Sequence, residues 1–170
     1  MTQKQTHIAY GFITALALVI LYVIFQVSGL SEQKWVQYVG WAIMLVGLVL
    51  NGMAFSKANN ADVRFGQVFS SCFKATAIIT IVVVIWTVAM FWIFPGMETQ
   101  MLEKARQAMA EKQNMSEEQI EKGMALTRKF FKVFMAAGSL FGTLIVGLIF
   151  SLIAAVVAKK NPQQQPGTIR

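Results

Sequence analysis

Four long runs of apolar residues divide the chain, and no charged residue interrupts any of them. A helix needs about 20 apolar residues to cross a hydrocarbon core of about 30 Å. The four runs reach this length, so we predict four transmembrane helices. They cover about residues 8–27, 36–55, 75–94 and 133–158.

Two of the runs admit another interpretation. The third contains Ile78 to Ile85, in which every residue is β-branched, and in water such a run would indicate a buried strand. Lipid requires the backbone to form its hydrogen bonds within its own segment, so a spanning helix is favoured. The first run is longer than the core of a signal peptide, which favours a retained helix over a cleaved leader.

Aromatic residues lie near the ends of the predicted helices, where a membrane protein meets the headgroup layer. The connection from 56 to 74 begins as a polar turn and continues as an amphipathic segment, with Phe65, Val68, Phe69 and Phe73 at helical spacing. We expect an interfacial helix here, and a lipid or regulator site is the alternative. The predicted interfacial anchors are Trp35, Tyr38, Trp41, Trp92, Arg64 and Lys74.

The connection between the last two spans is long enough to have structure of its own. Helix-forming residues fill its first part, and Ser116 followed by Gln119 is a capping box at a second helix start. We therefore predict an extramembrane helical hairpin over 97–132, with its second helix continuing into the last span. The apolar stripes of the two helices either pack against each other or the membrane surface, or form a groove for a partner.

Small residues recur four positions apart in the last span, and Gly40, Gly47 and Gly52 thin one side of the second span, so that helix backbones can approach closely. We expect packing within the bundle, and self-association is the alternative. The predicted packing residues are Gly138, Gly142, Gly147, Gly40 and Gly47.

The composition agrees with a membrane protein and not with a nucleic-acid-binding one. Hydrophobic residues make up 56% of the chain and charged residues only 14%, while the net charge is +7. Basic residues beside spans set orientation and explain this charge, so no nucleic-acid partner is expected.

The first loop carries little basic charge, which predicts that both termini are cytoplasmic. The fold class is all-α, with one membrane domain over 1–160 and a disordered tail over 161–170.

No catalytic, metal or cofactor site can be assigned from the sequence. His7 is the only histidine and Cys72 the only cysteine, and no Asp, Glu, Lys, Arg or His lies within the four runs. Gln26 and Asn51 lie near predicted span ends, where water would reach them.

We expect a non-enzymatic accessory or structural component of a membrane assembly. The alternatives are a small oligomeric transporter or channel and, less favoured, a membrane enzyme of lipid metabolism. The expected partners are the lipid bilayer and a membrane protein or a second copy of the chain.

The whole chain resembles the domain of unknown function 4199 family of small bacterial membrane proteins. Four segments carry the resemblance: Tyr10-Gly11-Phe12-Ile13, Arg64-Phe65-Gly66-Gln67-Val68-Phe69, Phe94-Pro95-Gly96 before a charged helical segment, and a last span that contains Gly147-Leu148-Ile149-Phe150-Ser151. The resemblance implies a multi-pass protein of the bacterial cytoplasmic (inner) membrane. It implies no activity and no site residues.

Overall fold

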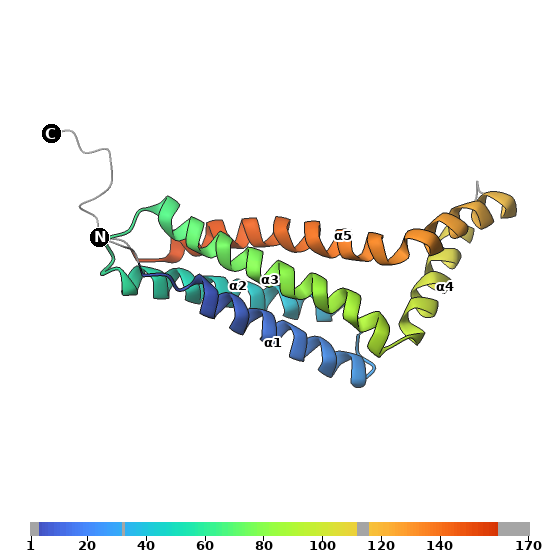
Figure 1. Cartoon of the computed structure of the whole chain (residues 1–170), viewed down its shortest axis with the longest axis horizontal. Coiled ribbons are helices and arrows are strands. Elements are labelled where there is room, and N and C mark those ends of the chain that lie inside the picture. Colours follow the sequence, from blue (N-terminus) through green and yellow to red (C-terminus); the bar gives the residue numbers. More distant parts are fainter. Residues whose placement is uncertain (1–3, 32, 112–115, 160–170) are drawn as a thin grey trace. The chain divides into compact units, whose positions relative to one another are not determined.

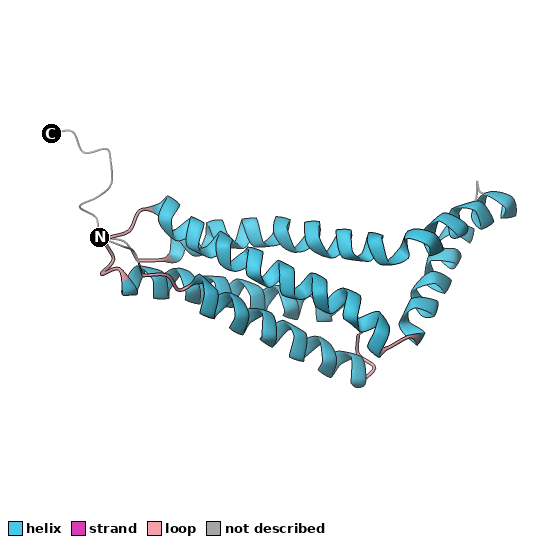
Figure 2. Ribbon diagram, in the orientation of Figure 1, coloured by secondary structure: helices cyan, strands magenta, loops and turns pink. Residues whose placement is uncertain are grey.

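The computed structural model describes residues 4–31, 33–111 and 116–159, and its regular structure within these ranges is entirely helical (Figure 2). The predicted all-α class is therefore confirmed. The helices are α1 (His7–Val27), α2 (Lys34–Ala58), α3 (Phe65–Ile93), α4 (Gly96–Ala110) and α5 (Glu117–Val157).

Four of these helices are long and apolar enough to cross a membrane. They are α1, α2, α3 and α5, with 21, 25, 29 and 41 residues. Their surfaces carry many large apolar side chains, and Ile13, Ile81 and Ile145 are 65%, 59% and 59% exposed. Such surfaces suit a lipid solvent, so the structure indicates a multi-pass membrane protein. The predicted disordered tail, 161–170, lies outside the described residues.

The chain forms two compact units. The first, here called the bundle unit, comprises Met1–Val83 and Leu140–Arg170, and the second, the α4 unit, comprises Val84–Ser139. In the bundle unit, α1, α2, the first part of α3 and the last part of α5 lie side by side (Figure 1). All four helices supply its core, whose wholly buried members include Ala15, Leu48, Ile79 and Ala154.

The helix α1 is followed by a glycine in the left-handed conformation that commonly ends helices. Gly29 has a φ of +69°, a left-handed conformation that L side chains rarely adopt. The amide of Leu30 donates to the carbonyl of Phe25 at 2.9 Å, and that of Gly29 to Gln26 at 3.2 Å. These two bonds form a Schellman motif, which turns the chain sharply toward α2.

The second connection is shorter than the apolar runs predict. The helix α2 continues to Ala58 and α3 begins at Phe65, so only 59–64 lie between them. The expected amphipathic segment forms the first turns of α3, and its Val68 is fully buried in the core of the bundle unit. A predicted span stops at the first charged residue. A helix requires only that its backbone hydrogen bonds continue, so α2 extends past Lys57.

The predicted hairpin between the last two spans is wrong in part. Only one separate helix, α4, lies between α3 and α5. The second helix of the expected hairpin is the beginning of α5, which runs without a break from Glu117 to Val157. This continuity was expected from the lack of a strong helix breaker. At 1.5 Å per residue, α5 is about 60 Å long, or roughly twice the thickness of a hydrocarbon core.

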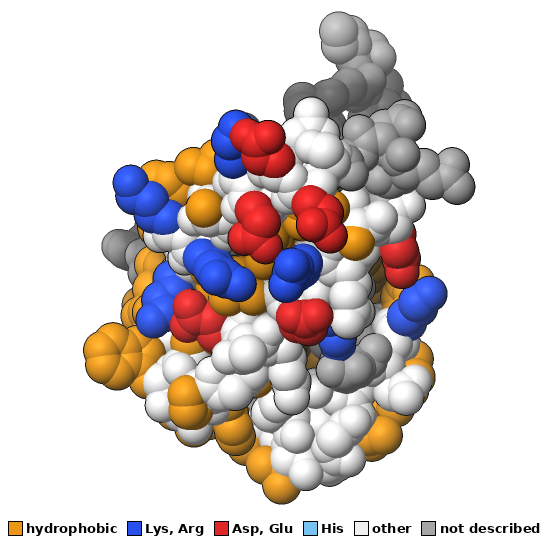
Figure 3. Space-filling view, turned by 90° about the vertical axis from the view of Figure 1, so that its right-hand side faces the viewer, with side chains coloured by type: hydrophobic (Ala, Val, Ile, Leu, Met, Phe, Trp, Pro, Cys, Tyr) orange, Lys and Arg blue, Asp and Glu red, His pale blue; other side chains and the backbone are white. Residues whose placement is uncertain are grey.

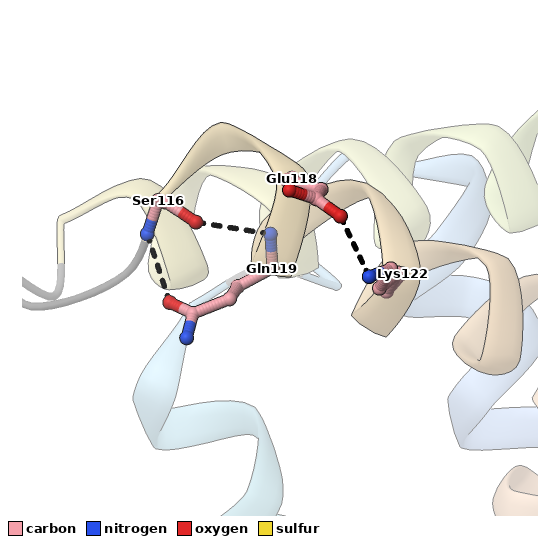
Figure 4. Close-up of polar contacts among 4 residues, drawn as sticks. All are labelled: Ser116, Glu118, Gln119 and Lys122. Atoms are coloured by element: carbon pink, nitrogen blue, oxygen red, sulfur yellow. Dashed lines mark hydrogen bonds and ion pairs between the residues drawn. The ribbon is translucent and has the colours of Figure 1, made fainter.

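The capping box at the start of α5 is present as predicted (Figure 4). The amide of Ser116 donates to Oε1 of Gln119 at 3.0 Å, and the amide of Gln119 donates to Oγ of Ser116 at 3.4 Å. One turn later, Lys122 and Glu118 form an ion pair at 2.7 Å. The reciprocal bonds satisfy two amides that a helix start leaves without partners, which explains why α5 begins here.

Methionine and phenylalanine side chains form the core of the α4 unit. Phe91 and Phe131 meet edge to face, with ring centroids 5.2 Å apart. Met90 is buried beside them, and Met97 and Met101 of α4 pack against this cluster. Nearer the start of α5, Ile120 and Met124 are also buried, so the apolar stripe expected on this segment faces inward for most of its length.

Candidate functional site

Two of the predicted packing glycines lie where no larger residue fits. A Cβ atom on Gly47 would lie 2.9 Å from Cβ of Thr14 and closer still to the rest of that side chain. A Cβ atom on Gly147 would lie 2.8 Å from Cε of Met44 and 2.9 Å from Oγ1 of Thr76. Each glycine thus receives a threonine from a neighbouring helix, at two separate places in the bundle unit.

The other predicted packing glycines have more space within the chain. A Cβ atom on Gly40 would be 4.0 Å from Leu18, an ordinary contact. On Gly138 and Gly142 it would meet nothing within 4 Å. The spacing of small residues in α5 therefore coincides with close packing at Gly147 but not at the two earlier positions.

A buried amide lies at the centre of a polar cluster in the bundle unit. Asn51 is fully buried, and its Oδ1 accepts a hydrogen bond of 2.8 Å from the hydroxyl of Thr6. Its Nδ2 faces the hydroxyl of Ser71 at 3.3 Å and the sulfur of Cys72 at 3.6 Å. The expectation that water reaches Asn51 is wrong, because α2 continues beyond it and the first turns of α3 cover it.

Hydroxyl groups continue along the interior of the same unit. Thr76 and Ser151, on α3 and α5, share a hydrogen bond of 3.2 Å, and both side chains are fully buried. One turn further along α3, Thr80 is only 2% exposed. Its hydroxyl has no hydrogen-bond partner among the described residues. That these hydroxyls meet could not be predicted, because the rotation of each helix is not readable from one sequence.

Side-chain hydrogen bonds also connect the segments before α1 and after α5 with the end of α2. Asn59 pairs with both the amide and the carbonyl of Lys4, at 3.0 and 3.2 Å. The hydroxyl of Ser56, at the end of α2, donates to the carbonyl of Lys159. The segments before α1 and after α5 are therefore both tied to the last turns of α2.

The predicted interfacial anchors are at the surface. Trp35 packs edge to face on Phe25 with centroids 5.3 Å apart, and Tyr38 does so on Trp41 at 5.7 Å. Trp92 is 79% exposed in the α4 unit. Arg64 and Lys74 are also exposed. These surroundings agree with a place in the headgroup layer, which stays a prediction.

A cavity of about 240 Å³ lies between α4 and the first part of α5, within the α4 unit. Its α4 residues recur at the spacing of one helix face, and Met124 and Arg128 are one turn apart on α5. Arginine, glutamate, threonine and apolar side chains meet in its wall. The lining residues are Thr99, Leu102, Glu103, Arg106, Met124 and Arg128.

The surface over α4 and the beginning of α5 carries acidic and basic side chains next to one another (Figure 3). Arg106 pairs with Glu121 at 3.1 Å, and Lys132 lies 3.6 Å from Glu98 and 5.9 Å from the ring centre of Trp92. Among the described residues, Glu103 and Arg128 have no ion-pair partner, although both line the cavity. No set of three potential metal ligands was found in that part of the chain.

The comparison with known families covers most of the chain. Residues 9–160 match the family model described as Protein of unknown function (DUF4199). The match includes every residue that lines the cavity and all of the polar cluster except Thr6. No curated protein and no solved structure matches the chain.

Proposed function

The chain belongs to the DUF4199 family that its sequence resembles, and from this premise and the packing of its helices we propose that it is a non-enzymatic accessory or structural component of a membrane assembly. In this role it makes contacts with lipid and with a membrane-protein partner. The four candidate spans fix it in the bilayer, and the α4 unit carries its charged surface.

The interlocking of threonines with glycines carries this proposal. At Gly47 and at Gly147, a single added carbon would collide with a neighbouring helix. Interiors packed to this degree suit a rigid support, and they leave little room for a solute to pass along the bundle axis. The buried amide and hydroxyl groups bond mainly to one another, as in helices that hold together inside lipid.

A small transporter or channel is the second candidate, and one observation favours it. The hydroxyl of Thr80 is buried without a partner among the described residues, one turn from the bonded pair of Thr76 and Ser151. Buried hydroxyls that lack a partner are uncommon unless water or a ligand reaches them. Flux of a solute into vesicles that contain the purified protein would favour this candidate over the accessory role.

The inner membrane of a bacterium is the proposed location, with both termini in the cytoplasm. The loop between α1 and α2 has few basic residues, whereas Lys57, Arg64 and Lys74 lie near the connection of α2 to α3. Fusions of a cytoplasm-only reporter test this orientation. We expect activity from a fusion at the C-terminus and none from a fusion after Glu111, and the opposite result would reverse the orientation.

Purification from the native membrane tests the accessory role. A tagged copy expressed at its natural level is cross-linked, extracted in mild detergent and analysed by quantitative mass spectrometry. We expect one membrane protein to co-purify reproducibly at a fixed ratio to the tagged chain. An unrelated tagged protein with four spans is the matched control. Recovery of the chain only with copies of itself would contradict the proposal.

A further inference from the structure

The cavity between α4 and α5 is lined by an acidic and a basic side chain that have no ion-pair partner among the described residues. Glu103 lies on its α4 side and Arg128 on its α5 side, and they form no ion pair with each other or with another described residue. Arg106 also lines the cavity, but Glu121 already compensates its charge at 3.1 Å. A ligand that pairs with both Glu103 and Arg128 therefore carries one cationic and one anionic group.

The rest of the lining narrows the chemistry of the ligand. Guanidinium groups bind phosphate oxygens through paired hydrogen bonds, and the hydroxyl of Thr99 adds a further donor. A carboxylate such as that of Glu103 accepts hydrogen bonds from a primary ammonium group. Leu102 and Met124 supply an apolar surface for short methylene segments, and methionine adapts easily to irregular shapes.

The position of the cavity along the helices agrees with the depth of a lipid headgroup. Arg128 precedes Val133, the first residue of the predicted last span, by five residues, or about 7.5 Å of helix. The headgroup layer on each side of a bilayer is about 5–8 Å thick. Trp92 and Lys132, which suit the same layer, meet in the same unit.

We infer that the α4–α5 cavity binds a phosphoethanolamine group, with its phosphate at Arg128 and its ammonium at Glu103. The source we favour is the headgroup of phosphatidylethanolamine in the surrounding membrane. This inference goes beyond the accessory role, because it concerns a small ligand and not a protein partner.

Lipid binding to the full-length protein tests the inference. The purified chain in detergent is titrated with palmitoyl-oleoyl phosphatidylethanolamine, and bound lipid is counted by native mass spectrometry. Phosphatidylglycerol and phosphatidylcholine with the same acyl chains are titrated in parallel. The first of these lacks an ammonium group, and the second has one that donates no N–H hydrogen bond. We expect binding of phosphatidylethanolamine to be about tenfold tighter than that of either comparison lipid.

Three substitutions separate this site from general attraction to lipid. Arg128→Gln is expected to weaken binding of phosphatidylethanolamine about tenfold, and Glu103→Gln to remove its advantage over phosphatidylglycerol. Lys129→Gln removes one positive charge beside the cavity without touching its lining, and we expect no change. All these residues are exposed, so circular dichroism and gel filtration should show folded protein in each case.

Soluble competitors test which chemical group the cavity recognises. Displacement of the lipid by O-phosphoethanolamine, but not by inorganic phosphate, would support the assigned headgroup chemistry. Equal displacement by both compounds would overturn the role of Glu103. Unchanged binding to the Arg128→Gln protein, or an equal loss in the Lys129→Gln protein, would overturn the site itself. None of these outcomes depends on whether a protein partner exists.

Discussion

The bundle unit and the α4 unit bury different kinds of side chain. The interior of the bundle unit combines small and branched residues with hydroxyls and one amide, whereas the cluster in the α4 unit consists of methionine, phenylalanine and leucine. In lipid, burial of apolar surface gives helices little reason to associate, so close packing and hydrogen bonds hold them. In water, burial of large apolar side chains is the main stabilising contribution.

This contrast shows which solvent each interior is built for. The bundle unit has interlocked glycines and threonines and an internal polar cluster, as expected of helices surrounded by lipid. The α4 unit has large aromatic and sulfur-containing side chains, drawn from α4 and from the ends of two predicted spans, and a surface over α4 and the start of α5 that is charged, as expected of helices that reach from the membrane into water. The two units should therefore respond differently to the same kind of substitution.

The largest effect is expected from filling a glycine contact in the bundle unit. Gly147→Leu would force a side chain against Thr76 and Met44, which already lie within 3 Å of the place of a Cβ atom. We expect the free energy of unfolding in detergent to fall by about 3 kcal/mol, at the upper end of overpacking effects. Thermal unfolding of the purified protein measures the change.

Gly142→Leu is the matched control, because it lies on the same helix and a Cβ atom there would meet nothing within 4 Å. It should unfold like the native chain. The smaller substitution Gly147→Ala should also destabilise the protein, and a second substitution, Thr76→Ser, should restore part of its stability. Thr76→Ser removes the methyl group that would collide with the new Cβ atom, and it keeps the hydroxyl that Ser151 contacts. If Gly142→Leu is as unstable as Gly147→Leu, the contrast drawn between these glycines is wrong.

In the α4 unit, loss of a large side chain should matter most. Phe131 is 6% exposed and meets Phe91 edge to face. We expect Phe131→Ala to destabilise the unit by about 2 kcal/mol. This is less than is typical for a fully enclosed core, because many of its neighbours are partly exposed. Limited proteolysis near Glu111 should become faster, while the bundle unit stays intact.

The neighbouring residue supplies the control for this prediction. Phe130 is 40% exposed, and Phe130→Ala should leave the rate of proteolysis nearly unchanged. Loss of both units together in the Phe131→Ala protein would show that they do not unfold separately, and the comparison between them would then fail.

The sequence allowed prediction of the features that depend on neighbouring residues. Apolar length identified the four candidate spans, and the spacing of Ser116 and Gln119 located the start of α5. The continuity of α5 followed from the absence of a strong breaker. These signals were sufficient because each depends on local hydrogen bonding or on the requirements of lipid.

The features that depend on helix rotation and tertiary contact could not be predicted. The spacing of small residues does not say which of Gly138, Gly142 and Gly147 faces another helix, and only the last is tightly enclosed. Asn51 was assigned to a wet helix end because the apolar run stops soon after it. The cavity lining was missed because Arg128 and Glu103 come from different helices and resemble ordinary surface charges in sequence.

Removal of the buried amide should have a moderate effect on the bundle unit. Asn51→Leu keeps a similar volume but leaves the hydroxyls of Thr6 and Ser71 without this partner. We expect a loss of about 1 kcal/mol in the free energy of unfolding, since hydrogen bonds between membrane helices contribute modestly. Gln37→Leu also replaces an amide side chain by leucine, at an exposed position of α2, and should be neutral. An unchanged Asn51→Leu protein would mean that the polar cluster contributes no stability.

The smallest effect is expected from the ion pair of Glu118 and Lys122, which lies on the exposed first turns of α5. The two side chains are 78% and 75% exposed, so water and salt screen their attraction. A double-mutant cycle with Glu118→Gln and Lys122→Gln should give a coupling of about 0.3–0.5 kcal/mol at low salt, and almost none at 1 M salt. The contribution of Asn51 should not change with salt, because its bonds are buried. A salt-sensitive effect at Asn51, or a salt-insensitive one at Glu118, would contradict the assignment of a lipid-adapted interior to the bundle unit and a water-adapted surface to the α4 unit.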